Sequence, residues 1–162
     1  LDGDAVIAPL VEAPWWTARR AANVDHAAAD ELLEQIEERH GDLGDAPVPQ
    51  WARGHGDWVP WNLARCHRGL VAWDWEYSAP VAPVGLDEIH SAFQINRLLR
   101  HRSAAESFEL SGAHSDPVLA AVQPLMAAER VQRALRAGCP LDDGGAETLA
   151  TAPAAVARAC AR

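Results

Sequence analysis

The sequence predicts an α+β domain that is predominantly α-helical and carries one small β-hairpin near its middle. Two observations lead to this prediction. Long segments with apolar residues at helical spacing lie on either side of a short central region, and within that region two apolar-rich segments meet across Arg68-Gly69. The chain has 162 residues, of which 49% are hydrophobic, so we expect one domain over residues 1–162 with its own core.

Each element follows from local signals. Residues 1–22 contain two prolines and are predicted to be irregular. A helix is expected from about Asp25 to His40, because Asp25 can cap its N-terminus, apolar residues recur at helical spacing, and Gly41 stands at its end. The glycine and prolines of residues 42–50 predict a loop.

The central and C-terminal segments alternate between short apolar runs and helical patterns. Asn62–His67 and Leu70–Trp75 are the predicted strands of the hairpin, and the prolines that follow predict a loop up to Gly85. Helices are expected from about Asp87 to His101, from about Pro117 to Ala137 and, more weakly, from about Glu147 to Ala161.

Composition and charge exclude several classes of function. The formal net charge is −9, and all 14 basic residues are arginines, so the chain lacks the basic cluster on which nucleic-acid affinity depends. No apolar run is long enough to span a bilayer, and the acidic start Leu1-Asp2-Gly3-Asp4 is unlike a signal peptide. We therefore predict a cytoplasmic protein without nucleic-acid or membrane partners. The acidic charge would suit a cationic ligand, although it also serves solubility.

The three cysteines, Cys66, Cys139 and Cys160, are widely separated and odd in number. This pattern fits neither a zinc site nor a disulfide framework, so we interpret them as reduced thiols. The abundance of alanine and arginine without lysine suggests a GC-rich bacterial coding sequence.

The segment with the strongest chemical signal is His55-Gly56-Asp57-Trp58-Val59-Pro60-Trp61-Asn62, which is followed by Asp74-Trp75-Glu76. Phosphoryl transfer needs a carboxylate that orients the attacking hydroxyl and oxygen ligands that hold Mg²⁺ against nucleotide phosphates. Protein kinases arrange these groups as His-x-Asp, four residues and Asn, with a later metal-binding Asp. His55, Asp57, Asn62 and Asp74 have this order and spacing.

The whole segment resembles the catalytic region of the aminoglycoside phosphotransferase and choline kinase family. His55-Gly56-Asp57 is similar to the family's His-Gly-Asp, and Pro60 and Asn62 fall where the family has proline and asparagine. Asp74-Trp75-Glu76 resembles its second acidic motif, and Gly85-Leu86-Asp87 its later glycine-to-aspartate stretch. The close resemblance covers about residues 50–90. It implies the C-terminal catalytic lobe of a protein-kinase-like fold, with the hairpin carrying the catalytic loop and the metal-binding aspartate.

The resemblance also implies a role for each residue. Asp57 would be the catalytic base, and Asn62 and Asp74 would hold Mg²⁺ and, through it, ATP or another nucleoside triphosphate. His55 would mainly brace the loop, and Glu76 would be a weaker contributor to a second metal ion or its waters. Asp87 would bond the loop backbone. The list of these site residues is His55, Asp57, Asn62, Asp74, Glu76 and Asp87.

Local turn chemistry is the simpler reading of some of these residues. Asp57 and Asn62 could be turn formers, since both residue types bond nearby backbone. Turn chemistry does not explain Asp74, because we expect it within an apolar strand. A buried carboxylate there needs a partner or a metal. Trp58 and Trp61 flank Asp57 and could line a substrate pocket, or they could pack in the core.

The nucleotide-binding half of such an enzyme is missing from the sequence. Kinase-like enzymes use an N-terminal lobe that supplies a lysine for the α- and β-phosphates and a glycine-rich loop over the nucleotide. This chain has no lysine, and no such loop precedes His55. We therefore expect a C-terminal portion of a longer enzyme, a truncation whose partner supplies the other lobe, or a relative that has lost catalysis.

The function that we expect is ATP-dependent transfer of phosphate to a hydroxyl of a small molecule, an aminoglycoside- or choline-like acceptor that bears an amine. Antibiotic resistance is one role that the resemblance implies. The first alternative is a catalytically inactive binding module for a small cationic ligand or a partner protein. The second is metal-dependent hydrolysis by His55, Asp57 and Asp74, although no further histidine cluster completes such a site in the sequence.

Overall fold

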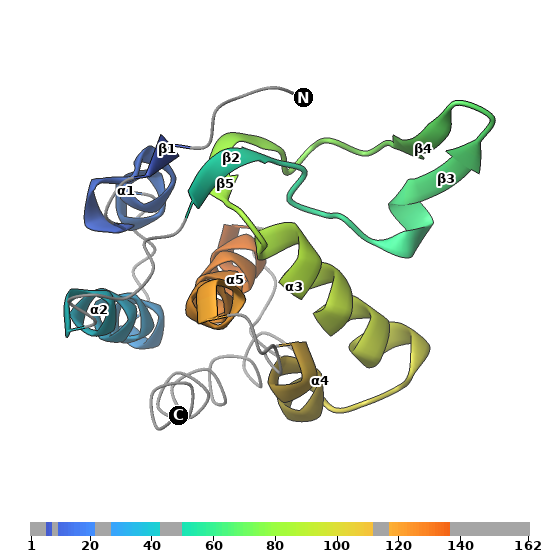
Figure 1. Ribbon diagram of the computed structural model, residues 1–162. Helices are drawn as coiled ribbons and strands as arrows, with labels where there is room; N and C mark the ends of the chain where they lie inside the picture. Colours follow the sequence, from blue (N-terminus) through green and yellow to red (C-terminus); the bar gives the residue numbers. More distant parts are fainter. Residues whose placement is uncertain (1–5, 8–9, 22–26, 43–49, 112–116, 137–162) are drawn as a thin grey trace.

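The computed structural model describes residues 6–7, 10–21, 27–42, 50–111 and 117–136 (Figure 1). Helices make up most of the described chain, together with a three-stranded and a two-stranded antiparallel sheet. The predicted α+β class is therefore confirmed. Among the described residues, no helix is both long and apolar enough to cross a membrane.

The N-terminal segment is more regular than the sequence predicts. It forms a short strand β1 (Val6–Ile7), a 3₁₀ turn η1 (Leu10–Glu12) and a helix α1 (Pro14–Ala21). The prediction of irregular structure was wrong because Pro14 occupies the first helical position, where the absence of an N–H leaves no hydrogen bond unmade. The buried Trp15 and Trp16 then anchor α1 in the core.

A three-stranded sheet joins segments for which the sequence predicts no strand. Its central strand β2 (Gln50–Gly54) pairs with β1 and with β5 (Ala79–Pro83), and Trp51 lies opposite Pro83. The prolines of β5 misled the prediction of a loop there. β5 has no further partner strand among the described residues, so the missing proline N–H groups can lie on the unpaired side of the strand.

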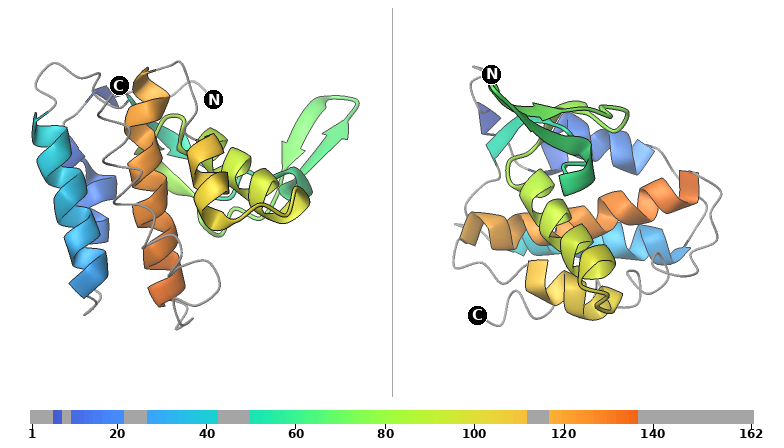
Figure 2. Two further views of the ribbon diagram at one scale, coloured as in Figure 1. Left: turned by 90° about the horizontal axis from the view of Figure 1, so that it is seen from below. Right: turned by 90° about the vertical axis from the view of Figure 1, so that its right-hand side faces the viewer.

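The predicted hairpin is present but shorter than expected. It consists of β3 (Leu63–Cys66) and β4 (Gly69–Ala72), joined by a turn at His67 and Arg68. The hairpin projects from the helical body, as Figures 1 and 2 show. Its strands are largely exposed, and so is Cys66, which is a free thiol.

The helices agree with the sequence in position more than in extent. α2 (Ala27–Asp42) runs through Gly41, and the proposed cap Asp25 and the helix predicted near 147–161 lie outside the described residues. α3 (Leu86–Gln94) continues into a wide π-helical turn η3 (Ile95–Leu99), and α5 (Pro117–Arg136) matches its prediction. The short helix α4 (Ala104–Ser111) was not predicted.

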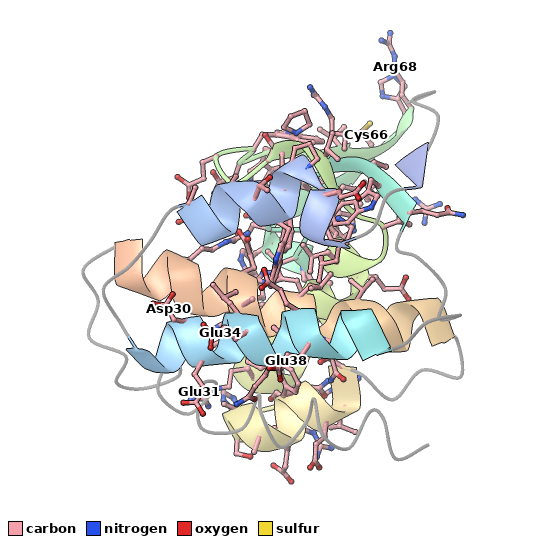
Figure 3. All side chains as sticks on the ribbon, turned by 90° about the vertical axis from the view of Figure 1, so that its left-hand side faces the viewer. Asp30, Glu31, Glu34, Glu38, Cys66 and Arg68 are labelled. Carbon is pink, nitrogen blue, oxygen red and sulfur yellow. The ribbon has the colours of Figure 1, made fainter. Side chains whose placement is uncertain are left out.

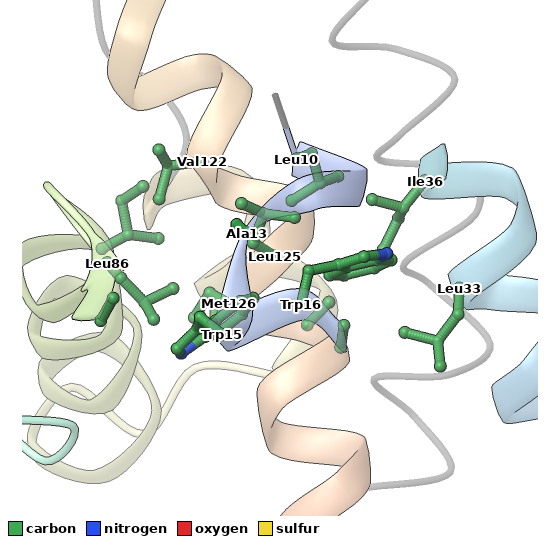
Figure 4. Packing of buried hydrophobic residues seen from close by; sticks show 14 of the residues in the cluster. Leu10, Ala13, Trp15, Trp16, Leu33, Ile36, Leu86, Val122, Leu125 and Met126 are labelled. Carbon is green, nitrogen blue, oxygen red and sulfur yellow. The ribbon is translucent and has the colours of Figure 1, made fainter. Parts of the chain in front are cut away.

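The core lies where the three longer helices meet α1 and the sheet. α2 and α5 pack side by side, and α3 crosses α5 on its other flank (Figure 2). Trp16, Ile36 and Leu125 bring α1, α2 and α5 together (Figure 4), and all three are at most 1% exposed. Burial of side chains of this size contributes roughly 1.5–3 kcal/mol each.

The outer face of α2 is acidic. Glu31, Glu34 and Glu38 are exposed, and Figure 3 shows them along this face with Asp30. Glu37 is different, because it accepts a hydrogen bond from the indole Nε1–H of Trp16. The outer face of α2 is thus solvated, whereas Glu37 holds a core tryptophan in place.

Candidate active site

The candidate site is built on the loop from His55 to Asn62, which connects the two sheets. β2 ends at Gly54, and β3 begins at Leu63, directly after a 3₁₀ turn η2 (Pro60–Asn62). Pro60 stands at the start of this turn, and Asn62 and the preceding Val59 are buried. The loop is therefore anchored by a strand on each side and by buried side chains within it.

Asp57 and Asn62 lie in direct contact. The Asn62 Nδ2 group donates to the Asp57 carboxylate oxygen Oδ2 at 2.9 Å and to the Asp57 backbone oxygen at 3.2 Å. Asp57 is partly exposed, whereas Asn62 is only 5% exposed. The pair that the kinase-like spacing singled out is thus brought together, and one carboxylate oxygen of Asp57 is held by the Asn62 amide.

The other oxygen of Asp57 is held by a residue that the sequence did not indicate. His90 of α3 places its Nε2 atom 2.9 Å from Asp57 Oδ1. No motif of the sequence singles out His90 as a site residue. Its helical spacing could have indicated that His90 points inward. The buried residues of α3 that share this spacing are Leu86, Ile89, His90 and Phe93.

Charge is distributed unequally over this pair. The hydrogen bond from His90 is the main cause that lowers the pKa of Asp57, against the opposing effect of its partial burial. Burial is the main cause that lowers the pKa of His90, and repulsion from Arg130 and Arg133 of α5 adds to it. Near neutral pH, Asp57 is therefore an anion and His90 is neutral, so the Nε2–H of His90 donates to the carboxylate.

The shifted pKa of His90 predicts that acid destabilises the fold. Its pKa is lowered from 6.5, so the unfolded chain binds more protons than the folded chain as pH falls below 6.5. The free energy of unfolding should therefore be fully retained above pH 6.5 and decrease as the pH drops below it. Urea unfolding at pH 7.5 and pH 5.5 measures this change. The His90→Phe variant should show a smaller change between these pH values, and an equal change would refute the assignment.

Asp87 holds the start of the loop from His55 to Asn62. Its two carboxylate oxygens accept hydrogen bonds from the backbone N–H groups of His55 and Gly56, both at 2.7 Å. Asp87 lies in the first turn of α3, where the helix dipole favours a negative charge. The side chain faces the loop backbone, which is the contact that the family resemblance implies for this residue.

His55 braces the loop against the end of the hairpin. The Asp57 N–H donates to His55 Nδ1 at 3.2 Å, so the ring proton resides on Nε2, which donates to the Trp73 carbonyl at 2.9 Å. The ring is buried and packs against the indoles of Trp58 and Trp75. This geometry suits a structural part and leaves the ring without a free nitrogen for proton transfer.

Arg133 ties the loop to α5. Its guanidinium donates to the Gly56 carbonyl at 2.7 Å, pairs with Glu129 at 2.9 Å and stacks over the Tyr77 ring at 4.2 Å. Gly56 has a φ of 83°, and a Cβ there would lie 2.2 Å from the Tyr77 carbonyl oxygen. The loop therefore requires glycine at this position for both backbone conformation and space.

We expect Gly56→Ala to destabilise the protein strongly. The added methyl group would overlap the Tyr77 backbone, which a side-chain rotation cannot relieve, so the loss should exceed about 3 kcal/mol. Gly69→Ala is the matched control: Gly69 also has a positive φ, 125°, but a Cβ there has no neighbour within 4 Å. Chemical denaturation of both variants measures the loss in the free energy of unfolding and separates the steric overlap from the cost of a positive φ. Equal losses in Gly56→Ala and Gly69→Ala would contradict the steric explanation.

Asp74 differs from its prediction. We expected a buried carboxylate within the second strand, but β4 ends at Ala72, and Asp74 follows it as an exposed residue with a φ of 61°. Beyond the last strand pair, the Trp73 N–H donates to the Asn62 carbonyl at 3.1 Å and closes the hairpin. Asp74 directly follows Trp73 and therefore lies at the base of the hairpin.

Asn62 and Asp74 carry oxygen atoms of the kind that Mg²⁺ prefers, and the family resemblance implies them as its ligands. The Nδ2 group of Asn62 is committed to Asp57, which leaves its Oδ1 as the atom that can bind a metal. Mg²⁺ usually keeps several waters and binds one or two carboxylates together with substrate phosphates. In the described part of the chain, no group of three or more His, Cys, Asp or Glu residues could hold a metal alone. Glu76 lies exposed in the turn after Asp74.

An open groove of about 610 Å³ lies next to the loop. Trp58 forms one wall, and the solvent-facing side of α3 forms the other, with Glu88, Ser91 and Ile95 at helical spacing. Trp58 thus lines a groove, whereas Trp61 is 42% exposed and no wall of this groove. An indole, two carboxylates and a hydroxyl, those of Trp58, Asp87, Glu88 and Ser91, thus line the groove, and Asp57 is not among its lining residues.

Comparisons with known proteins add no relative. A scan against models of protein families finds no match, and searches of curated proteins and of solved structures find none either. The resemblance to the aminoglycoside phosphotransferase and choline kinase family therefore rests on the motif residues of this chain, and the kinase-like lobe remains a proposal.

Proposed function

We propose that this chain supplies the catalytic lobe of an ATP-dependent phosphotransferase that acts on a hydroxyl of a small molecule. The observation that carries the proposal is the arrangement of Asp57. Its carboxylate is ionised, partly exposed and held on both oxygens, in a loop whose start is fixed by Asp87 and Arg133. A general base needs a carboxylate that is fixed in position yet open to the substrate.

The proposed reaction uses few protein groups. The acceptor hydroxyl donates its proton to Asp57 as its oxygen forms a bond to the γ-phosphorus of ATP, and the bond from that phosphorus to the bridging oxygen breaks to release ADP. Asn62 Oδ1 and the Asp74 carboxylate would hold Mg²⁺, which neutralises charge on the phosphates. Positioning is the larger part of catalysis in such transfers, and this accounts for the number of contacts that fix the loop.

The groove beside Trp58 supports an acceptor that bears an amine. Trp58, which lines the groove, directly follows Asp57 in the chain, and we propose that a ligand bound against the indole presents its hydroxyl to Asp57. The exposed carboxylate of Glu88 can pair with an ammonium group, and an indole face attracts the same charge. The net charge of −9 would further favour a cation.

Direct observation of phosphate transfer tests this proposal. The chain would be incubated with ATP, Mg²⁺ and, in turn, choline, an aminoglycoside and a neutral sugar, and phosphorus NMR would detect a phosphomonoester. The proposal predicts a new ester with an amine-bearing acceptor, and none when Mg²⁺ is omitted. An ester that also forms in the Asp57→Ala variant would contradict the assignment of the base.

A binding module without chemistry is the second candidate, and the complete absence of lysine favours it. Without a phosphate-binding lysine, nucleotide affinity depends on what Asn62 and Asp74 can contribute through the metal. A chain of this kind would bind a cationic ligand in the groove with the same affinity in the presence and absence of Mg²⁺ and ATP. Calorimetric titration with choline under both conditions distinguishes the two functions.

A further inference from the structure

We propose that His90 is a positioning residue that locks the Asp57 carboxylate in its reactive orientation. This inference rests on the proposed function for its catalytic meaning, but the contact itself stands on geometry. His90 Nε2 and Asp57 Oδ1 lie 2.9 Å apart, and the two residues come from separate elements, α3 and the catalytic loop. His90 acts on the hydroxyl only through Asp57.

The hydrogen bonds around Asp57 form a two-point support. Asn62 holds Oδ2 and His90 holds Oδ1, so the plane of the carboxylate is fixed from opposite sides. Asn62 lies in the same loop as Asp57 and would move with it. His90 is 4% exposed on the buried face of α3, packed into the core, and therefore fixes the carboxylate relative to the body of the protein.

Burial, with repulsion from two arginines, keeps His90 a neutral donor. Asp57 faces it from the loop and favours its protonation, whereas Arg130 and Arg133 face it from α5 and oppose it. Arg130 is itself a cation at neutral pH, because burial lowers its pKa only to about 10. A neutral imidazole with its proton on Nε2 can support Asp57 without taking the proton that the carboxylate must accept from the substrate.

The same clamp extends through α3 to the start of the loop. Asp87, on the first turn of this helix, holds the backbone of His55 and Gly56, and His90 holds the side chain of Asp57 one turn later. Residues at i and i+3 lie on neighbouring positions of a helix face. One rigid helix thus sets both the path of the loop and the direction of its carboxylate.

Three variants of the full chain test this role without any substrate. Three-bond couplings would measure the Asp57 χ1 rotamer, and long-range ¹H–¹⁵N spectra would identify the tautomer of His90. We expect one Asp57 rotamer and an Nε2–H tautomer in the natural chain, rotamer averaging in His90→Phe, and one rotamer again in His90→Gln, whose amide can donate. In Asp57→Ala the exchange of the His90 Nε2 proton should accelerate. Unchanged couplings in a folded His90→Phe variant, or an Nδ1–H tautomer in the natural chain, would overturn the proposal.

Kinetics then distinguish positioning from support of the fold. If phosphate transfer is observed, His90→Phe should lower kcat about 10–100-fold with little change in KM, and His90→Gln should recover part of the loss. A rise in KM with unchanged kcat would overturn the positioning role. Absence of transfer in the natural chain, together with the expected couplings, would refute the proposed function while the lock on Asp57 stands.

Discussion

Asp57→Asn should reduce phosphate transfer by about 10²–10⁴-fold, because an amide cannot accept the proton of the acceptor hydroxyl. The fold should change little. His90 is neutral and can shift its proton to Nδ1, which turns Nε2 into an acceptor for the new amide N–H, while the remaining oxygen still accepts from Asn62.

Turnover and stability should therefore separate in this variant. Phosphorus NMR would give the rate, and urea unfolding the free energy of unfolding, which we expect to fall by no more than about 1 kcal/mol. Asn62→Ala is a useful comparison, because it removes a buried amide and should affect both quantities. Substantial turnover in Asp57→Asn would remove Asp57 from the role of base.

Asp87→Ala should have the largest effect on stability among truncations of a single side chain at the site. It removes the acceptor of two charge-assisted hydrogen bonds, those from the N–H groups of His55 and Gly56 at 2.7 Å. Each such bond contributes about 1.5–3 kcal/mol, and partial access of water to the site moderates the sum, so we expect a loss of roughly 2–4 kcal/mol.

The neighbouring Glu88→Ala provides the matched control for Asp87→Ala. Glu88 occupies the same first turn of α3 and carries the same charge, but it is exposed and makes no clamp to the loop. Its removal should change the free energy of unfolding by less than about 0.5 kcal/mol. Equal losses in the two variants would show that charge at the helix N-terminus, and not the clamp, stabilises the loop.

The sequence predicted the catalytic loop better than its surroundings. His55, Asp57 and Asn62 lie close together in the sequence, so their spacing alone could indicate that they share one loop. The contacts of Asp57 with His90 and of Gly56 with Arg133 join positions far apart in the sequence, and no local pattern specifies such partners. Only the helical spacing of His90 with the buried Phe93 indicated that this histidine points inward.

The errors in the fold have the same origin. The prolines of β5 were read as signals for a loop, because local propensity favours one, but a strand with one unpaired side tolerates them. α1 was missed because Pro14 was interpreted as a breaker and not as the first residue of a helix. Asp74 was placed inside a strand whose last paired residue is Ala72, since hydrophobic spacing does not show where a hairpin closes.

We propose that this loop forms a nucleotide site through Asn62 and Asp74. Calorimetric titration of the chain with ATP, with and without Mg²⁺, tests it most directly, and Asp74→Asn serves as the control because Asp74 is exposed and its replacement should leave the fold intact. The proposal predicts binding that requires Mg²⁺ and is lost in Asp74→Asn. Binding that is indifferent to Mg²⁺ or to Asp74, or no binding at all, would contradict it.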